Sequence, residues 1–268
     1  MPVYVIKANG EKELFDPAKL KRTLLRAGAS QVHAEEIIKD ADRFVFDGMT
    51  TKELLKKVLG GLRSVPVIAG RYDLKGALLR LGPTGFTFEQ FMARVLQEYG
   101  YATQTDQILA GKCVKHEVDI LAAKGKKTTF VECKYHNAPG IYTDLHVAMY
   151  TWARFIDLKE GKEKVDEGLL ITNTKFSMDA MDFGICRGLR MMGWNFPKGE
   201  GLQDRIEKKD LWPITVLKVD KFLIEQLSSN RLLLVKDIAK MNPEALAKKA
   251  KIPRPKADAL VTQAKSFL

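Results

Sequence analysis

The spacing of apolar residues changes twice along the chain and divides it into three segments. In the first, residues 1–84, apolar residues alternate on both sides of an Asn-Gly turn, which predicts a β-hairpin. Asp16 and Pro17 then have the residue types of a helix cap and a first helical turn, and Gly28 is typical of a helix end. The helical period predicts three more helices, at about 34–46, 50–62 and 68–80.

The second segment, residues 85–218, alternates between helical and strand patterns. Two tryptophan-led stretches, at 194–196 and 212–219, each predict a short strand. This order predicts an α/β fold in which helices flank a mixed sheet. The longer elements are a helix at 87–100, a hairpin at 116–134, a helix at 143–161, a strand at 168–174 and a helix at 176–193.

The third segment, residues 219–268, contains four short helical patterns, so we expect a small all-α module. The stretch LGPTG, residues 81–85, has the glycine and proline of a linker, or begins the second segment. The expected parts are therefore 1–84, 85–218 and 219–268.

The hairpin at 116–134 sets charged residues among apolar residues that suit a buried sheet. Buried charges are costly unless they are paired or bound to a metal. Side chains alternate across a strand, so Glu132 and Lys134 share one face. A four-residue turn at 124–127 places Asp119 opposite Glu132 on that face. Two carboxylates and an ammonium group are therefore expected to meet at one point.

This combination suits a hard divalent cation. Such a cation typically takes one or two carboxylates, with water and substrate phosphate oxygens as further ligands. It lowers the pKa of a bound water and stabilises charge on phosphorus, while a nearby lysine positions that water. The arrangement is therefore suited to phosphodiester hydrolysis.

The same residues resemble the PD-(D/E)XK nucleases, in which an aspartate on one strand precedes a D/E-x-K triplet on the next. The order of further motifs is similar to the Mrr-type restriction endonuclease branch, although His116-Glu117 stands where that branch usually has glycine. The motifs are FEQF with Glu89, Gly100-Tyr101, HEVDIL…FVECK and ITNTKFSMDA. The resemblance implies that Asp119 and Glu132 bind Mg²⁺ or Mn²⁺, Lys134 acts on the water, and Glu89 completes the acidic site. The implied substrate is double-stranded DNA.

Two alternatives to a magnesium nuclease remain at this stage. Cys113 and His116, together with Cys133 and His136, have the residue types and spacing of zinc ligands. Positions three apart on a regular strand point to opposite faces, which disfavours a tetrahedral site. The second alternative is a nuclease fold that only binds DNA. His136, just past the strand, is either a DNA contact or an ordinary surface histidine.

The first segment resembles the ATP-cone, a small regulatory nucleotide-binding domain of ribonucleotide reductases and of a repressor of their genes. The shared pattern is VIKANGEKELFDPAKLKRTLLRAG, followed by FDGMTTKELLKKVL. This implies that ATP or dATP binds through Val5, Lys7, Lys19 and Thr51. Two family contacts are missing, because Ala8 replaces an arginine and Leu55 replaces a histidine.

The third segment resembles a helix-hairpin-helix module, which binds the DNA backbone through loop amides. The loop of this chain, residues 251–255, has no glycine, and its two prolines remove N–H donors. Arg254 and Lys256 are therefore expected to contact DNA phosphate by charge. A packing or dimerising helical bundle is an equal alternative.

Composition adds the expected setting. The net charge is +11, and its excess lies at the two ends: residues 1–80 hold 15 basic and 10 acidic residues, and residues 221–268 hold 10 and 4. Basic segments attract polyanions, although solvated lysine-rich helices give the same count. The three cysteines and the lack of a long apolar run lead us to expect a cytoplasmic protein without a membrane span. For a nuclease of this kind we also expect a homo-oligomer, a dimer or larger. The rival function is a non-catalytic, nucleotide-responsive DNA-binding regulator.

Overall fold

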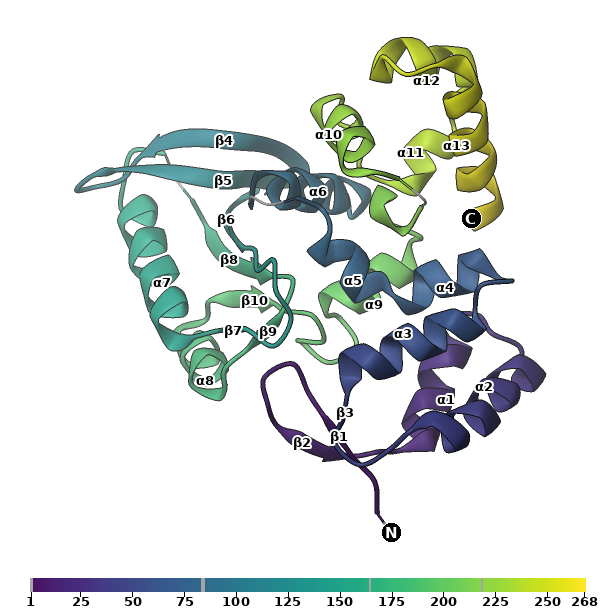
Figure 1. Cartoon of the computed structure of the whole chain (residues 1–268). Helices are drawn as coiled ribbons and strands as arrows, with labels where there is room; N and C mark the ends of the chain where they lie inside the picture. Colours follow the sequence, from purple (N-terminus) through teal and green to yellow (C-terminus); the bar gives the residue numbers. More distant parts are fainter. Residues whose placement is uncertain (1, 83–84, 164, 218) are drawn as a thin grey trace. The chain divides into compact units, whose positions relative to one another are not determined.

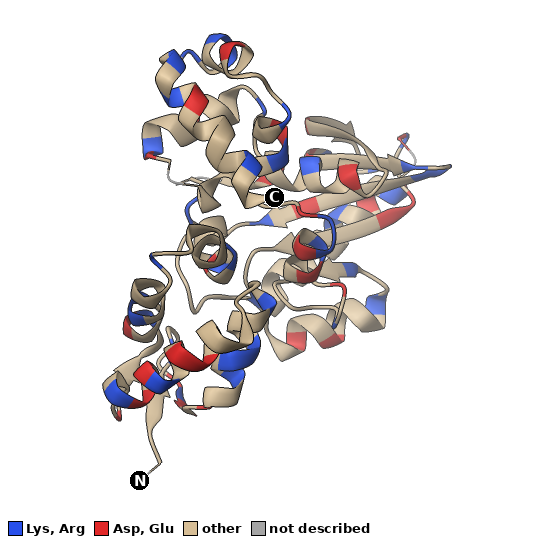
Figure 2. Ribbon diagram, turned by 90° about the vertical axis from the view of Figure 1, so that its right-hand side faces the viewer, with Lys and Arg blue, Asp and Glu red and all other residues tan. Residues whose placement is uncertain are grey.

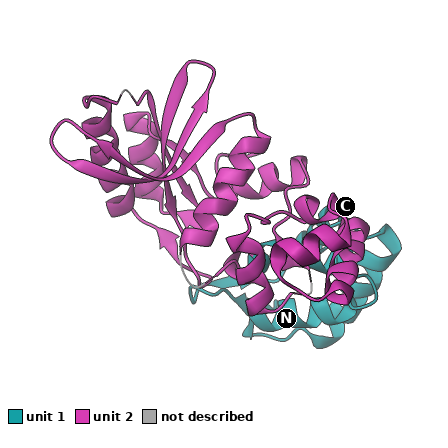
Figure 3. Ribbon diagram, turned by 90° about the horizontal axis from the view of Figure 1, so that it is seen from above, with its two compact units in different colours: residues 1–77 teal, residues 78–268 magenta. Residues whose placement is uncertain are grey.

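The computed structural model describes residues 2–82, 85–163, 165–217 and 219–268, in two compact units (Figure 3). The first unit contains residues 1–77 and the second residues 78–268. The predicted third segment lies in the second unit. The three-part division of the sequence remains a prediction, and Pro83 and Thr84 of the predicted linker lie outside the described residues.

The first unit contains a three-stranded sheet with the order β2-β1-β3. Its strands are β1 (Tyr4–Ile6), β2 (Lys12–Leu14) and β3 (Met49–Thr50). The predicted hairpin is confirmed, because β1 and β2 pair antiparallel around a turn in which Gly10 has φ 86°. The pattern missed β3, which is parallel to β1 and only two residues long.

Four helices follow or flank this sheet: α1 (Pro17–Arg26), α2 (Gln31–Phe44), α3 (Thr51–Gly61) and α4 (Pro66–Tyr72). Asp16 caps α1 as predicted, since its carboxylate accepts from the Ala18 N–H at 2.8 Å. The single helix predicted at 68–80 is wrong. The chain breaks it at Asp73, whose N–H closes α4 on Ala69 and whose carbonyl starts α5 (Leu74–Leu79) by accepting from Ala77.

The second unit is built on a five-stranded mixed sheet with the order β10-β8-β6-β5-β4 (Figure 1). Strands β4, β5 and β6 are antiparallel neighbours, whereas β6, β8 and β10 run parallel. The predicted mixed α/β sheet is therefore confirmed. The strands are β4 (Ala102–Ala110), β5 (Lys115–Lys124), β6 (Lys127–Lys134), β8 (Glu167–Thr172) and β10 (Arg190–Met192).

Helices cover both faces of this sheet. Phe130 of β6 packs in one apolar cluster with Phe155, whereas Tyr135, which directly continues β6 and is an odd number of residues later, packs in a tilted arrangement on Phe88 with ring centroids 5.4 Å apart. Because odd spacing changes the face of a strand, α6 and α7 lie on opposite faces. The bounds of the helices are α6 (Gly85–Glu98), α7 (Leu145–Lys159), α8 (Met178–Arg187) and α9 (Leu202–Lys208).

The strand predictions need correction at several points. The helix predicted at 176–193 ends at Arg187, and Arg190–Met192 form the strand β10 instead. The pattern missed the edge strand β4, because the half-buried face of that strand carries Thr103, Thr105 and Gln107 instead of apolar residues. The strand predicted at 212–219 is wrong: Ile214–Val216 form a 3-10 helix after Pro213, and Lys218 lies outside the described residues. The stretch 194–196 contributes a single bridge partner, Phe196. Two short strands, β7 (Tyr142–Thr143) and β9 (Lys175–Phe176), form a small separate sheet.

The C-terminal segment folds as four short helices, as predicted. Its second helix joins α6 through partly buried ion pairs: Arg94 contacts Asp237 at 2.9 Å, and Glu98 contacts Lys236 at 2.6 Å. No helix among the described residues is long and apolar enough to span a membrane. The four helices are α10 (Lys221–Ser229), α11 (Val235–Ala239), α12 (Pro243–Ala250) and α13 (Arg254–Phe267).

Candidate active site

The β5–β6 hairpin has the predicted register, and its regular ladder ends beside Asp119. The four-residue turn pairs Ala123 with Thr128, and the described pairs continue to Ile120 and Val131. At the next position, the Asp119 carboxylate accepts from the backbone N–H of Cys133 at 2.7 Å. A side chain thus takes over a hydrogen bond that the neighbouring backbone would make in a regular ladder.

Glu132 is held by Arg154, a residue that the sequence analysis missed. Arg154 lies on α7, and its guanidinium donates to the Glu132 carboxylate and to the Glu117 carbonyl. It also stacks over the rings of Phe130 and Tyr150, at 5.2 and 5.5 Å from their centroids. Only 10% of the Arg154 side chain is exposed. The guanidinium is therefore a fixed cation beside one predicted metal ligand.

A sequence signal for Arg154 existed but was weak. Thr151, Arg154 and Leu158 fall on one helical stripe of α7, and all three are buried. An arginine on the core-facing stripe of a helix needs a partner, because a buried guanidinium is costly alone. The sequence could show that a partner was needed, but not that it was Glu132.

Glu89, from α6, shares the electrostatic field of the two hairpin acids. Burial raises the pKa of Glu89 to about 7, and the negative charges of Asp119 and Glu132 add to the shift. Burial also raises the pKa of Glu132 to about 7, with Asp119 adding and Arg154 opposing. The pKa of Asp119 is raised by burial too, although its bond from Cys133 opposes the shift. The positive charge of Arg154 therefore does not fully offset the negative charge of these three carboxylates.

Lys134 ends β6 and is exposed. It stands two residues beyond Glu132, and its positive charge opposes part of the rise in the pKa of that carboxyl. The structure thus brings together all four residues predicted as catalytic, from α6, β5 and β6. Their catalytic roles remain predictions.

The residues at this point fit a hard divalent cation. Their donors are carboxylate oxygens, which Mg²⁺ and Mn²⁺ prefer, and the raised pKa values mark negative charge that a cation would offset. Within the described ranges, no three His, Cys, Asp or Glu side chains are already arranged as a ligand shell. Water and substrate oxygens would therefore have to supply the remaining ligands.

The zinc alternative is wrong for the described residues. His116 is bonded through Nε2 to Asp157 at 2.8 Å, and the same aspartate accepts from the backbone N–H of Cys113 at 2.8 Å. Cys133 is buried, whereas Cys113 is exposed. The two cysteine–histidine pairs therefore do not converge, in agreement with the alternation of strand faces.

His136, the predicted DNA contact beside the site, sits in a hydrogen-bond network. Its backbone N–H donates to Asn173, and its Nε2 is 3.0 Å from the Thr143 hydroxyl. Thr143 in turn donates to Thr172 at 2.9 Å, and both threonines are buried. This network ties the chain after Lys134 to the end of β8. A DNA contact of His136 remains a prediction.

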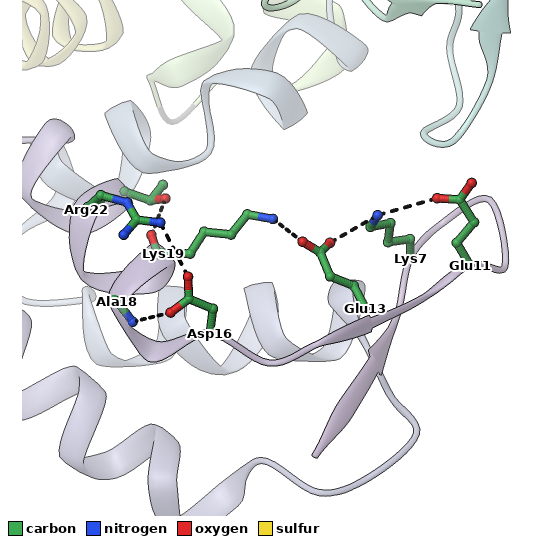
Figure 4. Close-up of polar contacts among 8 residues, drawn as sticks. Lys7, Glu11, Glu13, Asp16, Ala18, Lys19 and Arg22 are labelled. Atoms are coloured by element: carbon green, nitrogen blue, oxygen red, sulfur yellow. Dashed lines mark hydrogen bonds and ion pairs between the residues drawn. The ribbon is translucent and has the colours of Figure 1, made fainter. Parts of the chain in front are cut away.

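In the first unit, two of the predicted nucleotide contacts meet at one carboxylate (Figure 4). Glu13 pairs with Lys19 at 2.6 Å and with Lys7 at 3.1 Å. A cavity of about 150 Å³ lies beside it, and its lining includes Val5, Lys19 and Thr51. All four predicted residues therefore line this cavity or pair with a carboxylate that does.

The predicted DNA contacts of the C-terminal segment are held in ion pairs. Arg254 pairs with Asp258 at 3.3 Å, and Lys256 pairs with Asp220 at 2.9 Å. The loop before them has Lys251 at φ 51°, a conformation that favours glycine. Figure 2 shows acidic residues interspersed among the basic ones on these helices. The phosphate contact of Arg254 and Lys256 remains a prediction.

Comparison with known proteins finds a family model and relatives that resemble this chain. The family model described as restriction endonuclease (Mrr catalytic) matches residues 82–192, from before α6 to the end of β10. An uncharacterised protein of Archaeoglobus fulgidus is 37% identical over 177 residues, which is 66% of this chain and 99% of the relative. The crystal structure of AF1548, a protein of unknown function, superposes with a TM-score of 0.62 at 35% identity, covering 68% of this chain and 97% of that one.

The raised pKa of Glu89 predicts how the stability of the protein depends on pH. With its pKa raised to about 7, native Glu89 binds a proton more tightly than unfolded Glu89, so stability is lost as pH rises from about 4.5 to 7. In metal-free protein, Glu89→Gln should therefore stabilise at pH 8 by on the order of 1 kcal/mol, after discounting for partial exposure. The midpoint temperature of thermal unfolding should rise by about 2–4 °C in this variant at pH 8 and should hardly change at pH 5.

A carboxyl on the same helix provides the control. Glu98 has a lowered pKa: burial opposes the shift, but bonds from Lys236 and Arg94 outweigh it. Glu98→Gln should therefore destabilise at pH 8, with the opposite sign. Equal stabilisation by Glu89→Gln at both pH values would contradict the account.

Proposed function

The chain belongs to one family with the archaeal protein and carries a Mrr-type restriction endonuclease domain at residues 82–192, and from this premise we propose that it is a metal-dependent endonuclease acting on double-stranded DNA. The observation that carries the proposal is the shared electrostatic field of Glu89, Asp119 and Glu132, inside the matched segment, in which burial and the neighbouring carboxylates raise the pKa of Glu89 and of Glu132 to about 7. Lys134 lies beside them.

In this proposal Asp119 and Glu132 hold Mg²⁺ or Mn²⁺, and Glu89 completes the acidic site. A cation bound there would supply an activated water and would stabilise the charge that develops on the phosphorus. Arg154 keeps one oxygen of Glu132 in place from the α7 side. Lys134 orients the attacking water, which is the role that an exposed ammonium next to the carboxylates can take. One such site cuts one strand, so cutting both strands of a duplex needs two sites. We therefore propose that the protein acts as a homo-oligomer, a dimer or larger.

The first unit adds nucleotide regulation to the proposal. Lys7 and Lys19 already hold one anionic group, the Glu13 carboxylate, at the edge of a cavity. A triphosphate of ATP or dATP offers more negative charge than that carboxylate and would replace it between the two lysines. Val5 and Thr51 line the same cavity and would contact the nucleoside.

Plasmid cleavage tests the catalytic proposal. Supercoiled plasmid should be nicked or linearised by the wild type with Mg²⁺ and remain intact with EDTA. Asp119→Asn and Lys134→Ala should each lower the rate by at least about 100-fold, because each removes a group that acts on the reacting atoms.

Lys126→Ala, in the turn of the same hairpin, is the matched control. It removes an exposed lysine far along the strands from Asp119, and it should cut within about twofold of the wild type. A wild type that leaves plasmid intact with Mg²⁺ or Mn²⁺, with or without ATP, would refute the endonuclease and favour the non-catalytic regulator.

Calorimetric titration with ATP and dATP tests the nucleotide proposal. Lys19→Ala should weaken binding by roughly 10-fold or more, because it removes a charge-assisted contact to phosphate. Lys21→Ala, on the same helix but paired with Glu35 at 2.9 Å, should bind like the wild type. Equal loss in both variants would mean that general charge, and not this cavity, attracts the nucleotide.

A further inference from the structure

A second cavity, of about 330 Å³, lies in the larger unit on the α6 and β4 side of the sheet. Its lining is polar and rich in amides. The lining includes Gln90, Arg94, Gln97, Thr103, Gln107 and Arg231. The predicted catalytic residues do not line it, and the proposed hydrolysis does not use it.

This cavity is next to the candidate active site along both elements that form it. On α6, Gln90 directly follows Glu89. On β4, Gln107 pairs with Val118, the neighbour of Asp119 in β5. A DNA strand with its phosphate at the carboxylates would therefore have an adjacent nucleotide within reach of the cavity.

The cavity wall presents hydrogen-bond acceptors. The side-chain oxygen of Gln90 is buried and has no hydrogen-bond partner among the described residues, which is costly unless a ligand donates to it. The Gln107 amide nitrogen donates to the Thr105 and Asp106 carbonyls, at 2.8 and 3.3 Å. Backbone carbonyls can only accept, so this contact fixes the nitrogen and leaves the Gln107 oxygen as the group offered to a ligand.

Gln97 lines the same wall, and its amide nitrogen donates to the Thr103 hydroxyl at 2.8 Å. Positive charge is scarce at this wall. The Arg94 guanidinium is already paired with Glu98 at 2.8 Å and Asp237 at 2.9 Å. Arg231, from the loop between α10 and α11, is exposed. A ligand here is therefore neutral and rich in N–H donors, with at most one anionic group near Arg231.

We propose that this cavity holds one unstacked nucleobase of the DNA substrate, a base with an amino group, while Arg231 contacts its phosphate. The inference rests on the proposed endonuclease function and adds the form of DNA that it recognises. Adenine, cytosine and guanine carry an amino group that suits the glutamine oxygens, whereas thymine does not. A base stacked in a duplex cannot enter a cavity, so the nucleotide must leave the stack or come from an unpaired stretch. The helical C-terminal segment forms part of this site through Arg231.

Fluorescence of 2-aminopurine tests the proposal, since this base carries an amino group and brightens when it leaves the stack. Duplexes with a single 2-aminopurine, stepped through the positions around the mapped cut, are bound to the full chain with Mg²⁺ in the Lys134→Ala background. We expect one position to brighten severalfold. Adding Gln90→Met or Gln97→Met should abolish most of that rise, whereas Gln203→Met, a matched change on α9, should keep it.

The outcomes separate this proposal from the endonuclease. A wild type that cuts plasmid, and a background variant that binds DNA by anisotropy without brightening at any position, would overturn the nucleobase site alone. A rise that persists in Gln90→Met and Gln97→Met would place the unstacked base elsewhere and also overturn it. A wild type that neither binds nor cuts DNA would remove both proposals.

Discussion

Electrostatic repulsion among Glu89, Asp119 and Glu132 is the constraint on which the site depends. The three carboxyls come from a helix and two strands that bury them together, and burial with mutual repulsion raises the pKa of Glu89 and of Glu132 to about 7. Such an arrangement works against folding stability, so it needs rigid support. The antiparallel ladder and the packing of α6 and α7 on opposite faces provide that support.

Arg154 offsets part of the repulsion among these carboxylates. Its guanidinium binds the Glu132 carboxylate and a backbone carbonyl of β5. It also lies over the rings of Phe130 and Tyr150, which limit its movement. It therefore joins α7 to both arms of the hairpin at the point where the acids lie. The single positive charge of Arg154 leaves net negative charge at this point. A divalent metal ion bound there would neutralise that charge.

The sequence could predict the hairpin and its acids, because local information determines them. Turn length and strand alternation gave the pairing of Ala123 with Thr128, and the same alternation argued against zinc. The pairing of Arg154 with Glu132 was beyond reach, because the two residues are 22 positions apart and no local pattern links them. Strand β4 was missed because its half-buried face is polar, and the strand predicted at 212–219 failed because Pro213 interrupts it. The cavity of α6 and β4 depends on that missed strand.

Titration of metal-free protein with Mg²⁺, followed by calorimetry at pH 7 in two buffers of different ionisation enthalpy, tests the central claim most directly. If the carboxylates are poised for a cation, the wild type binds Mg²⁺ and releases roughly one proton, because groups with a pKa of about 7 must ionise fully to coordinate. Asp119→Asn should weaken that binding by at least about 10-fold. Binding of equal strength in Asp119→Asn, or binding with no proton release, would contradict the account.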